Sequence, residues 1–378
     1  MVKRKLQRLL ITATSFPATQ NDWRGRFIYD MAESLVRSGA TQLSFWGPAG
    51  DLPFGVESAL AGDDASWLGR MVVRGGIAHL LRDRPLLGGA MALGLLYRLR
   101  QAYRRFAAGG GPAVAHVNWL QNVLPLKGLR LPALVTVLGS DLGLLRLPGM
   151  VPMLRAVLRE RPAVLAPNAE WMVPVLRRHF GDVAEIRAIP FGVHGRWFAI
   201  ERPLTAATSG DWLVVSRVTR AKLGHLLEWG DGLFGGRRRL HLLGPMQEAI
   251  ELPNWVRHHG ATHPQALADD WFPRAEGLLT LSTHDEGRPQ VMIEAMAAGL
   301  PIIASDLPAH RDLLCSGENG LLVGDREAFR SALEQLGEAG AGHALGEAAR
   351  RWVAAQIGTW DDCARRYLGA YKDLQGRA

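Results

Sequence analysis

The sequence predicts an α/β protein made of two domains, each with a parallel β-sheet. Short apolar segments alternate with longer segments of helical periodicity through most of the chain, and this alternation is typical of βα units. The length of 378 residues suits two domains of ordinary size. Residues 192–210 contain several glycines, serines and threonines and show little periodicity, so we expect the hinge between the domains there.

Five buried strands and one early helix are expected in the first half. The first strand, at residues 9–13, follows three basic residues, as the apolar part of a secretory signal does. Nearby threonine and serine residues cut its apolar run short, which favours the strand over the signal. The helix is expected over residues 26–38, ended by Gly39. The other strands are expected at residues 114–117, 133–138, 164–166 and 186–189.

A further helix is expected after Pro85, within residues 80–106. Its apolar positions favour packing on its own domain, and arginines 98, 100, 104 and 105 near its end suit a helix C-terminus. The same pattern is also typical of an amphipathic helix that lies flat on a membrane. The sequence leaves both interpretations open.

The second half continues the alternation of strands and helices. Strands are expected at residues 212–216, 240–243, 277–281 and 302–304, and helices at residues 222–229 and 291–298. A closing helix over residues 360–374 carries Cys363, Tyr367, Leu368 and Tyr371 at helical spacing. That spacing indicates a face packed on the core.

The composition excludes several classes of protein. With 48% hydrophobic and 21% charged residues, the chain is globular rather than disordered or collagen-like. Its two cysteines, Cys315 and Cys363, are too few for a disulfide framework or a cysteine-rich zinc site, and they suit the cytoplasm. The sequence has no run of about 18 apolar residues, so no helix that spans a membrane is expected.

Positive charge is concentrated in the first half of the chain. Residues 1–200 hold 25 Lys and Arg against 13 Asp and Glu, whereas the whole chain holds 44 against 36. A basic half suits an anionic membrane surface or a phosphorylated substrate, and a solvated surface is the plainer interpretation. The sequence contains no helix-turn-helix and no RNA-binding aromatic motif, so nucleic acid is not an expected partner.

Two acidic residues flank a strand-to-helix turn in the second half. Glu286 and Glu294 are separated by seven residues, with Gly287 and Pro289 in the turn and the helix beginning near Gln290. Free N–H groups at a helix start form an anion site, and the carboxylates could accept hydrogen bonds from ribose and sugar hydroxyls. The plainer alternative is that Glu286 caps the helix and Glu294 is solvated.

Two cations follow an earlier strand of the same half. Arg217 and Lys222 lie five residues apart, one at the strand end and the other at the next helix start. A guanidinium fork and an ammonium point charge could bind one diphosphate together. Taken alone, this spacing is a weak signal in an arginine-rich chain.

Together, these motifs resemble the donor-binding domain of the retaining glycosyltransferases of family 4, which have the GT-B fold. The segment Glu286-Gly287-Arg288-Pro289 is similar to the branch that builds bacterial exopolysaccharides and lipopolysaccharides. The resemblance implies two Rossmann-like domains facing across a cleft. It assigns residues 1–194, with a returning helix at 362–378, to the acceptor and residues 195–361 to the nucleotide-sugar donor. In the first half the matching segments are Trp23–Phe27, Leu138–Asp141 and Ile189–Val193.

The resemblance implies transfer of a sugar, with retention, from a nucleotide-diphosphate sugar to a glycan or lipid-linked acceptor in bacterial cell-surface polysaccharide synthesis. The leaving diphosphate would take the acceptor proton, and no metal and no other cofactor is expected. The nucleotide, UDP or GDP, stays open, as does attachment of a cytoplasmic enzyme to the inner face of the membrane. The implied catalytic residues are Glu286, Arg217, Lys222, Asn118 and His116. The implied donor-binding residues are Gly25, Arg217, Lys222, Gly287, Arg288, Pro289, Gln290, Val291 and Glu294, and the implied acceptor-side residues are Ser140 and Asp141.

Three positions depart from the family pattern. Asn118 stands where the second histidine of a His-x-His segment is usual, Leu138 replaces another histidine, and Gln290 stands where Asn is common. His116 could then be a core histidine rather than a ligand. These departures support an alternative function, a non-catalytic nucleotide-sugar-binding partner of a polysaccharide-synthesis complex. Another GT-B chemistry, such as a phosphorylase or an epimerase, is a second alternative.

Overall fold

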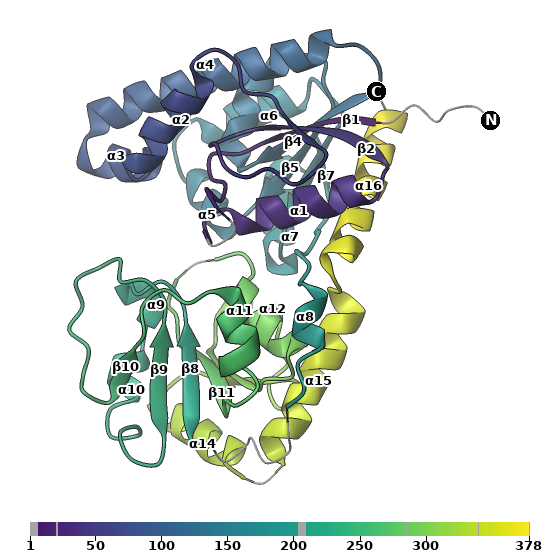
Figure 1. Cartoon of the computed structure of the whole chain (residues 1–378). Coiled ribbons are helices and arrows are strands. Elements are labelled where there is room, and N and C mark those ends of the chain that lie inside the picture. The colour runs from purple at the N-terminus through teal and green to yellow at the C-terminus, as the bar shows by residue number, and fades with distance from the viewer. Residues whose placement is uncertain (1–6, 20–21, 203–208, 285, 339, 378) are drawn as a thin grey trace. The chain divides into compact units, whose positions relative to one another are not determined.

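The computed structural model describes residues 7–19, 22–202, 209–284, 286–338 and 340–377 (Figure 1). The chain forms two compact units. Unit 1 comprises Met1–Phe191 and Trp360–Ala378, and unit 2 comprises Gly192–Thr359. Each unit has one parallel sheet covered by helices, so the predicted α/β class with two parallel-sheet domains is confirmed.

The sheet of unit 1 has seven strands in the order β3-β2-β1-β4-β5-β6-β7, and all neighbours are parallel. The strands are β1 Gln7–Thr12, β2 Thr41–Trp46, β3 Val56–Ser58, β4 Ala113–Asn118, β5 Ala133–Val137, β6 Ala163–Pro167 and β7 Glu185–Ile186. The helices are α1 Arg26–Arg37, α2 Asp64–Val73, α3 Ile77–Asp83, α4 Pro85–Ala108, α5 Gly139–Leu144, α6 Met150–Leu158, α7 Val173–Phe180 and α16 Trp360–Gly376, with 3₁₀ turns η1 Leu120–Leu126 and η2 Glu170–Met172.

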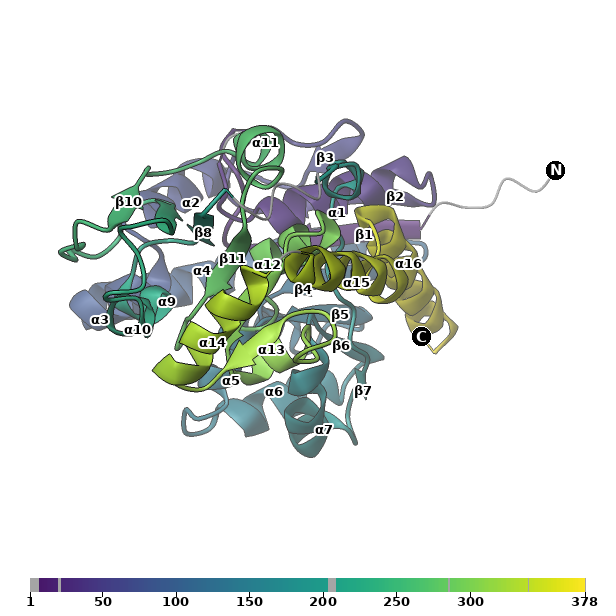
Figure 2. The same ribbon diagram turned by 90° about the horizontal axis from the view of Figure 1, so that it is seen from below.

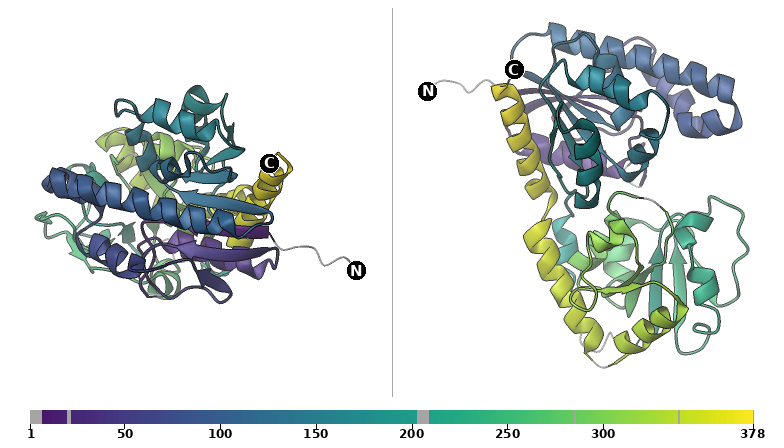
Figure 3. Two further views of the ribbon diagram at one scale, coloured as in Figure 1. Left: turned by 90° about the horizontal axis from the view of Figure 1, so that it is seen from above. Right: turned by 180° about the vertical axis from the view of Figure 1, so that it is seen from behind.

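Alternate residues of the unit 1 strands pack into two hydrophobic cores, one on each face of the sheet. Leu9 and Ile11 pack toward α1 and α16, where Tyr367 and Tyr371 are fully buried. Leu10 packs on the opposite face, in the core that also includes α4. Figures 1 and 3 show α1 beside α16 on one face and α4 across the other. Both helices predicted to bury an apolar face, after Pro85 and from residue 360, therefore do so.

The sheet of unit 2 has six parallel strands in the order β10-β9-β8-β11-β12-β13. The strands are β8 Asp211–Val215, β9 Arg239–Leu243, β10 Val256–His258, β11 Gly277–Thr280, β12 Ile302–Ser305 and β13 Leu321–Val323. The helices are α8 Gly195–Phe198, α9 Arg220–Leu223, α10 Leu226–Trp229, α11 Pro264–Ala266, the π-helix η4 Leu267–Trp271, α12 Gln290–Ala297, α13 Pro308–Arg311, α14 Arg326–Leu336 and α15 Ala341–Gln356.

Two layers of helices enclose the sheet of unit 2. Helices α12 and α15 lie side by side on one face, where Met296 and Val353 are buried together (Figure 2). Phe329 and Leu333 of α14 pack on the other face. Among the helices of the described residues, none combines the length and the apolar character that crossing a bilayer requires.

Three elements differ from the prediction. The helix expected over 222–229 is two short helices, because Gly224 has φ +53° and a Cβ there would lie 1.9 Å from the Leu281 carbonyl oxygen. The strand expected at 186–189 is only Glu185–Ile186. The expected hinge at 192–210 begins with folded residues of unit 2, including α8, and its residues 203–208 lie outside the described residues.

Candidate functional site

The predicted site motifs of unit 2 follow two neighbouring strands, β8 and β11. Arg217 and Lys222 come after β8, the Glu286 loop comes after β11, and β12 lies next to β11 in the sheet. The carboxyl ends of parallel strands meet at one edge of a sheet, and ligands of open α/β sheets bind at that edge. Close backbone packing joins the loops, since a Cβ at Gly224 or at Gly244 would collide with a carbonyl oxygen of the next loop.

Lys222 and Glu286 form an ion pair at this edge. Lys222 Nζ lies 2.5 Å from Glu286 Oε2, and each side chain is 16% exposed. Thr219 holds the start of α9 in place, because its hydroxyl accepts a hydrogen bond from the Lys222 backbone N–H at 3.2 Å. The second carboxylate oxygen, Glu286 Oε1, is buried without a hydrogen-bond partner among the described residues. A buried acceptor of this kind is a ready partner for a ligand hydroxyl.

Arg217 stands at the surface of the same edge. It is exposed, and its Nη1 donates to Gln247 Oε1 at 3.3 Å. The structure therefore brings Lys222 and Glu286 into contact, and it places Arg217 in the loop that leads from β8 to α9.

The start of α12 offers backbone donors. Pro289 precedes the helix, and its carbonyl accepts from the N–H groups of Met292 and Ile293. The N–H groups of Gln290 and Val291 have no acceptor within the described part of the chain. Such groups, with the helix dipole, favour an anion. Glu294 is half-buried one turn further along α12.

Two side chains of this segment make contacts within unit 2, and their expected ligand contacts stay predictions. The guanidinium of Arg288 forms a buried ion pair with Asp312, with Nε 2.8 Å from Oδ2. The guanidinium of Arg288 is therefore already engaged by a carboxylate. Gln290 Nε2 donates to the Gly192 carbonyl at 2.8 Å and ties α12 to the first residue of unit 2.

One candidate residue, His310 of α13, was missed by the sequence analysis. It is fully buried, and its Nδ1 lies 2.7 Å from the Ser305 carbonyl oxygen, so Nδ1 carries the hydrogen. Its Nε2 has no hydrogen-bond partner among the described residues. Burial lowers the pKa of His310, and the charges of Glu286 and Lys222 shift that pKa in opposite directions. His310 thus favours its neutral form, and its Nε2 is available as an acceptor.

In unit 1, the structure corrects the catalytic role expected for His116. The side chain is 0% exposed, and both ring nitrogens are occupied, Nδ1 by the Tyr371 hydroxyl at 2.6 Å and Nε2 by the Thr136 hydroxyl at 2.7 Å. Burial lowers the pKa of His116 to about 3. A buried imidazole with both nitrogens bonded cannot touch a substrate, so His116 belongs to the core.

Asp141 is also structural, contrary to its expected acceptor-side role. It is 1% exposed, and its carboxylate accepts from the backbone N–H groups of Leu138 at 2.7 Å and Leu120 at 3.2 Å. It caps α5, and burial raises its pKa to about 7. Ser140, the other acceptor-side candidate, is exposed.

Asn118 and Gly25 have local roles that the sequence did not show. Asn118 is fully buried at the end of β4, where Nδ2 donates to the Thr12 carbonyl at 3.2 Å and Oδ1 has no partner within the described residues. Gly25 has φ +67°, and a Cβ there would lie 2.8 Å from the backbone of Ser15 and Phe16. Glycine is therefore required for local packing, and its expected approach to a diphosphate stays a prediction.

Comparisons with known proteins find glycosyltransferases. The family profile described as "Glycosyl transferases group 1" matches residues 225–338, all within unit 2. The chain is 37% identical over 120 residues to the UDP-N-acetylglucosamine–peptide N-acetylglucosaminyltransferase GtfA subunit of Streptococcus parasanguinis, covering 30% of this chain and 21% of that one. It spans at most 23% of the length of the curated relatives it matches.

Solved structures are similar over nearly the whole chain. Sucrose-phosphate synthase from Thermosynechococcus elongatus has a TM-score of 0.73 at 18% identity, covering 98% of this chain and 100% of that chain. Anabaena HepE in complex with UDP and glucose has a TM-score of 0.64 at 12% identity, with 97% and 100% covered. The chain thus has the two-domain, Rossmann-like fold of GT-B glycosyltransferases, and residues 225–338 are similar to the group 1 glycosyltransferase profile.

Proposed function

We propose that this protein is a glycosyltransferase of family 4 that moves a sugar from a nucleotide-diphosphate sugar to a glycan or lipid-linked acceptor. The observation that carries the proposal is the Lys222–Glu286 ion pair beside the start of α12, at the carboxyl edge of the unit 2 sheet. This arrangement combines a cation, backbone donors and an unsatisfied carboxylate oxygen, which suit a diphosphate joined to a polyhydroxylated sugar.

In the proposed reaction, the bond between the anomeric carbon and the diphosphate oxygen breaks. The acceptor oxygen forms its bond to the same face of that carbon, and its proton goes to the leaving diphosphate, so the configuration is retained. Negative charge grows on the diphosphate. Lys222, Arg217 and the N–H groups of Gln290 and Val291 would stabilise it, which is how preorganised donors accelerate such steps.

The remaining polar groups would position the donor. Glu286 Oε1 would accept from a sugar hydroxyl, His310 Nε2 would accept from a second hydroxyl, and Glu294 would bind the ribose. On binding, Lys222 would be shared between Glu286 and the diphosphate. Since Lys222 and Arg217 already provide two cations, we further propose that transfer needs no divalent ion, so EDTA would leave the rate unchanged.

We assign the reaction to bacterial cell-surface polysaccharide synthesis. The Glu286-Gly287-Arg288-Pro289 segment supports this branch. The GtfA relative is named for UDP-N-acetylglucosamine, and the HepE structure holds UDP, so UDP-sugars are the first donors to test. We also propose that the enzyme works at the inner face of the cytoplasmic membrane, because the excess positive charge lies in residues 1–200.

Product analysis tests this function. The protein is incubated with UDP-, GDP- and ADP-sugars, with and without a bacterial lipid and glycan extract. We expect one donor to release nucleoside diphosphate only when the extract is present, and NMR of the product to show the donor's anomeric configuration. If a donor binds but no sugar is transferred to any acceptor, the protein is the non-catalytic partner that the departures at Asn118 and Leu138 suggest.

A further inference from the structure

Helix α4 of unit 1 has apolar side chains on two opposite faces. Leu95 and Leu99 are buried in the core. Leu86, Leu93 and Tyr97 are exposed by 92%, 70% and 66%. These three residues are spaced by seven and four positions, so they form one stripe along the helix. An apolar stripe that stays exposed among the described residues of unit 1 indicates a surface for a partner outside the unit.

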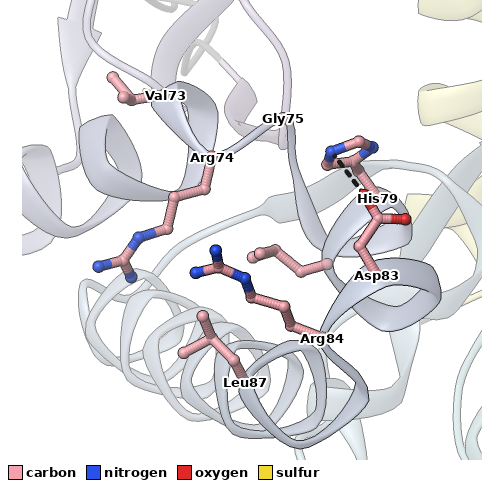
Figure 4. Close-up of a pocket in the computed structure, with 8 residues that line it drawn as sticks. Val73, Arg74, Gly75, His79, Asp83, Arg84 and Leu87 are labelled. Atoms are coloured by element: carbon pink, nitrogen blue, oxygen red, sulfur yellow. Dashed lines mark ion pairs between the residues drawn. The ribbon is translucent and has the colours of Figure 1, made fainter.

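A pocket of about 440 Å³ lies at the N-terminal end of this stripe. It is lined by residues from the end of α2, from α3 and from the start of α4. Helix α3 packs beside the first half of α4 (Figures 1 and 3). Figure 4 shows Arg74 and Arg84 extending into the same space, with Leu87 beside Arg84.

The pocket has unbalanced positive charge. Arg74 and Arg84 are exposed, and the structure gives neither guanidinium a hydrogen bond or an ion pair among the described residues. The carboxylate in the pocket, Asp83, is paired with His79 at 3.1 Å and with Arg82 at 3.2 Å. The two arginines are therefore available for a ligand anion.

The start of α4 strengthens this charge. The helix has 24 residues, begins at Pro85 and carries no acidic residue in its sequence. The positive end of its dipole is therefore not neutralised by its own side chains. Arginines favour phosphate because the guanidinium presents a fork of donors to phosphate oxygens.

We propose that the outer surface of α2–α4 docks on an anionic bilayer, and that the pocket holds the phosphate of a lipid headgroup between Arg74 and Arg84. Leu86, Leu93 and Tyr97 would then enter the boundary between headgroups and acyl chains. A bilayer presents phosphates directly above apolar chains over a wide plane, which matches a phosphate-sized basic pocket beside an apolar stripe. This surface would be the part of unit 1 that makes the membrane attachment proposed above. The docking does not depend on the transfer reaction.

Vesicle binding of the full chain tests the proposal. Vesicles of phosphatidylcholine alone are compared with vesicles that also contain phosphatidylglycerol, at low and high salt. The test variant is R74Q/R84Q. The control is R177Q/R178Q, which removes the same charge from exposed positions on α7 of the same unit.

We expect binding to the anionic vesicles at low salt, with a partition coefficient about thirtyfold lower for R74Q/R84Q, given about 1 kcal/mol per arginine near the surface. The control should bind like the wild type. Leu93→Gln should weaken binding without changing the dependence on salt, because it removes apolar contact and no charge.

Three outcomes would overturn the proposal. One is failure of the wild type to bind anionic vesicles. Another is an equal loss for both arginine pairs, which would mean diffuse charge rather than this pocket. The last is binding of inorganic phosphate to the wild type, lost in R74Q/R84Q, with no binding to vesicles. That result would make the pocket a site for a soluble ion. Nucleotide binding, measured on the same preparations, reports on the donor site separately, so failure of one proposal is distinguishable from failure of the other.

Discussion

Lys222 Nζ lies 2.5 Å from Glu286 Oε2 and joins α9, the helix that follows β8, to the loop after β11. The two residues are 64 positions apart in sequence, and neither motif alone predicts that they touch. Glu286 Oε2 holds the Lys222 ammonium in position. The other carboxylate oxygen, Glu286 Oε1, has no hydrogen-bond partner among the described residues. The pair therefore presents both a cation and an acceptor to a ligand at the carboxyl edge of the sheet.

Glu286→Gln separates binding of the sugar from binding of the diphosphate. We expect the nucleotide sugar to bind about tenfold more weakly, because a hydrogen bond to a charged acceptor is lost. The nucleoside diphosphate alone should bind at least as well as before, since Lys222 is released from the carboxylate. Calorimetric titration of both ligands measures the split.

The control for this variant is Glu334→Gln, an exposed position on α14. Equal losses for the nucleotide sugar and for the nucleoside diphosphate in Glu286→Gln would contradict the role of Glu286 in binding the sugar.

Arg288→Met tests whether the buried pair with Asp312 holds the loop before α12. The variant removes the guanidinium that pairs with the Asp312 carboxylate, which is 5% exposed. Breaking a buried pair in this way costs about 3–5 kcal/mol of unfolding free energy. Urea denaturation measures the loss.

The neighbouring pair Arg311–Asp306 is a matched control because its side chains are 59% and 38% exposed. Arg311→Met should change the unfolding free energy by less than about 1 kcal/mol. Equal changes in the unfolding free energy for the two variants would show that the buried Arg288–Asp312 pair stabilises the fold no more than an exposed pair does.

His310 should stay neutral to a lower pH in the native protein than in the unfolded chain. Burial lowers its pKa, and its Nδ1 hydrogen is donated to the Ser305 carbonyl. Nitrogen NMR of the folded protein should show a neutral imidazole with the hydrogen on Nδ1. A pKa of His310 that is equal in the folded and unfolded protein, or higher in the folded protein, would refute its role as an acceptor.

His116 should make stability depend on pH. Its pKa falls from about 6.5 in the unfolded chain to about 3 in the fold. Between these values only the unfolded state binds the proton, so the His116 contribution is present above pH 6.5 and is lost as the pH falls. Between pH 7 and pH 5 the wild type should lose about 2 kcal/mol more than His116→Gln. Equal losses in urea melts at the two pH values would rule this out.

The sequence predicted the central strands best because they are buried on both faces and appear as continuous apolar runs. It missed β2, where Gln42 and Ser44 interrupt the apolar pattern, and the three-residue strands β3, β10 and β13 at or next to the sheet edges. The break between α9 and α10 was also missed, since it comes from Gly224 packing on the distant Leu281 carbonyl.

The sequence identified several residues of the candidate site, but it did not identify which of them contact one another. The motifs located Lys222 and Glu286, whose pairing is tertiary. The burial of His116 and Asp141 depends on partners such as Tyr371 and Leu120, which local spacing cannot identify. His310 was missed because its tautomer and its free nitrogen are properties of the packed structure.

The measurement that tests the central claim most directly is a titration of UDP, GDP, ADP and dTDP into the wild type and Lys222→Met. Lys127→Met, an exposed position in unit 1, is the control. We predict that one nucleoside diphosphate binds the wild type and the control, and binds Lys222→Met about 10- to 100-fold more weakly. If none of the four binds the folded wild type, or if Lys222→Met binds as tightly as the control, the carboxyl edge of the unit 2 sheet is not a nucleotide-sugar site.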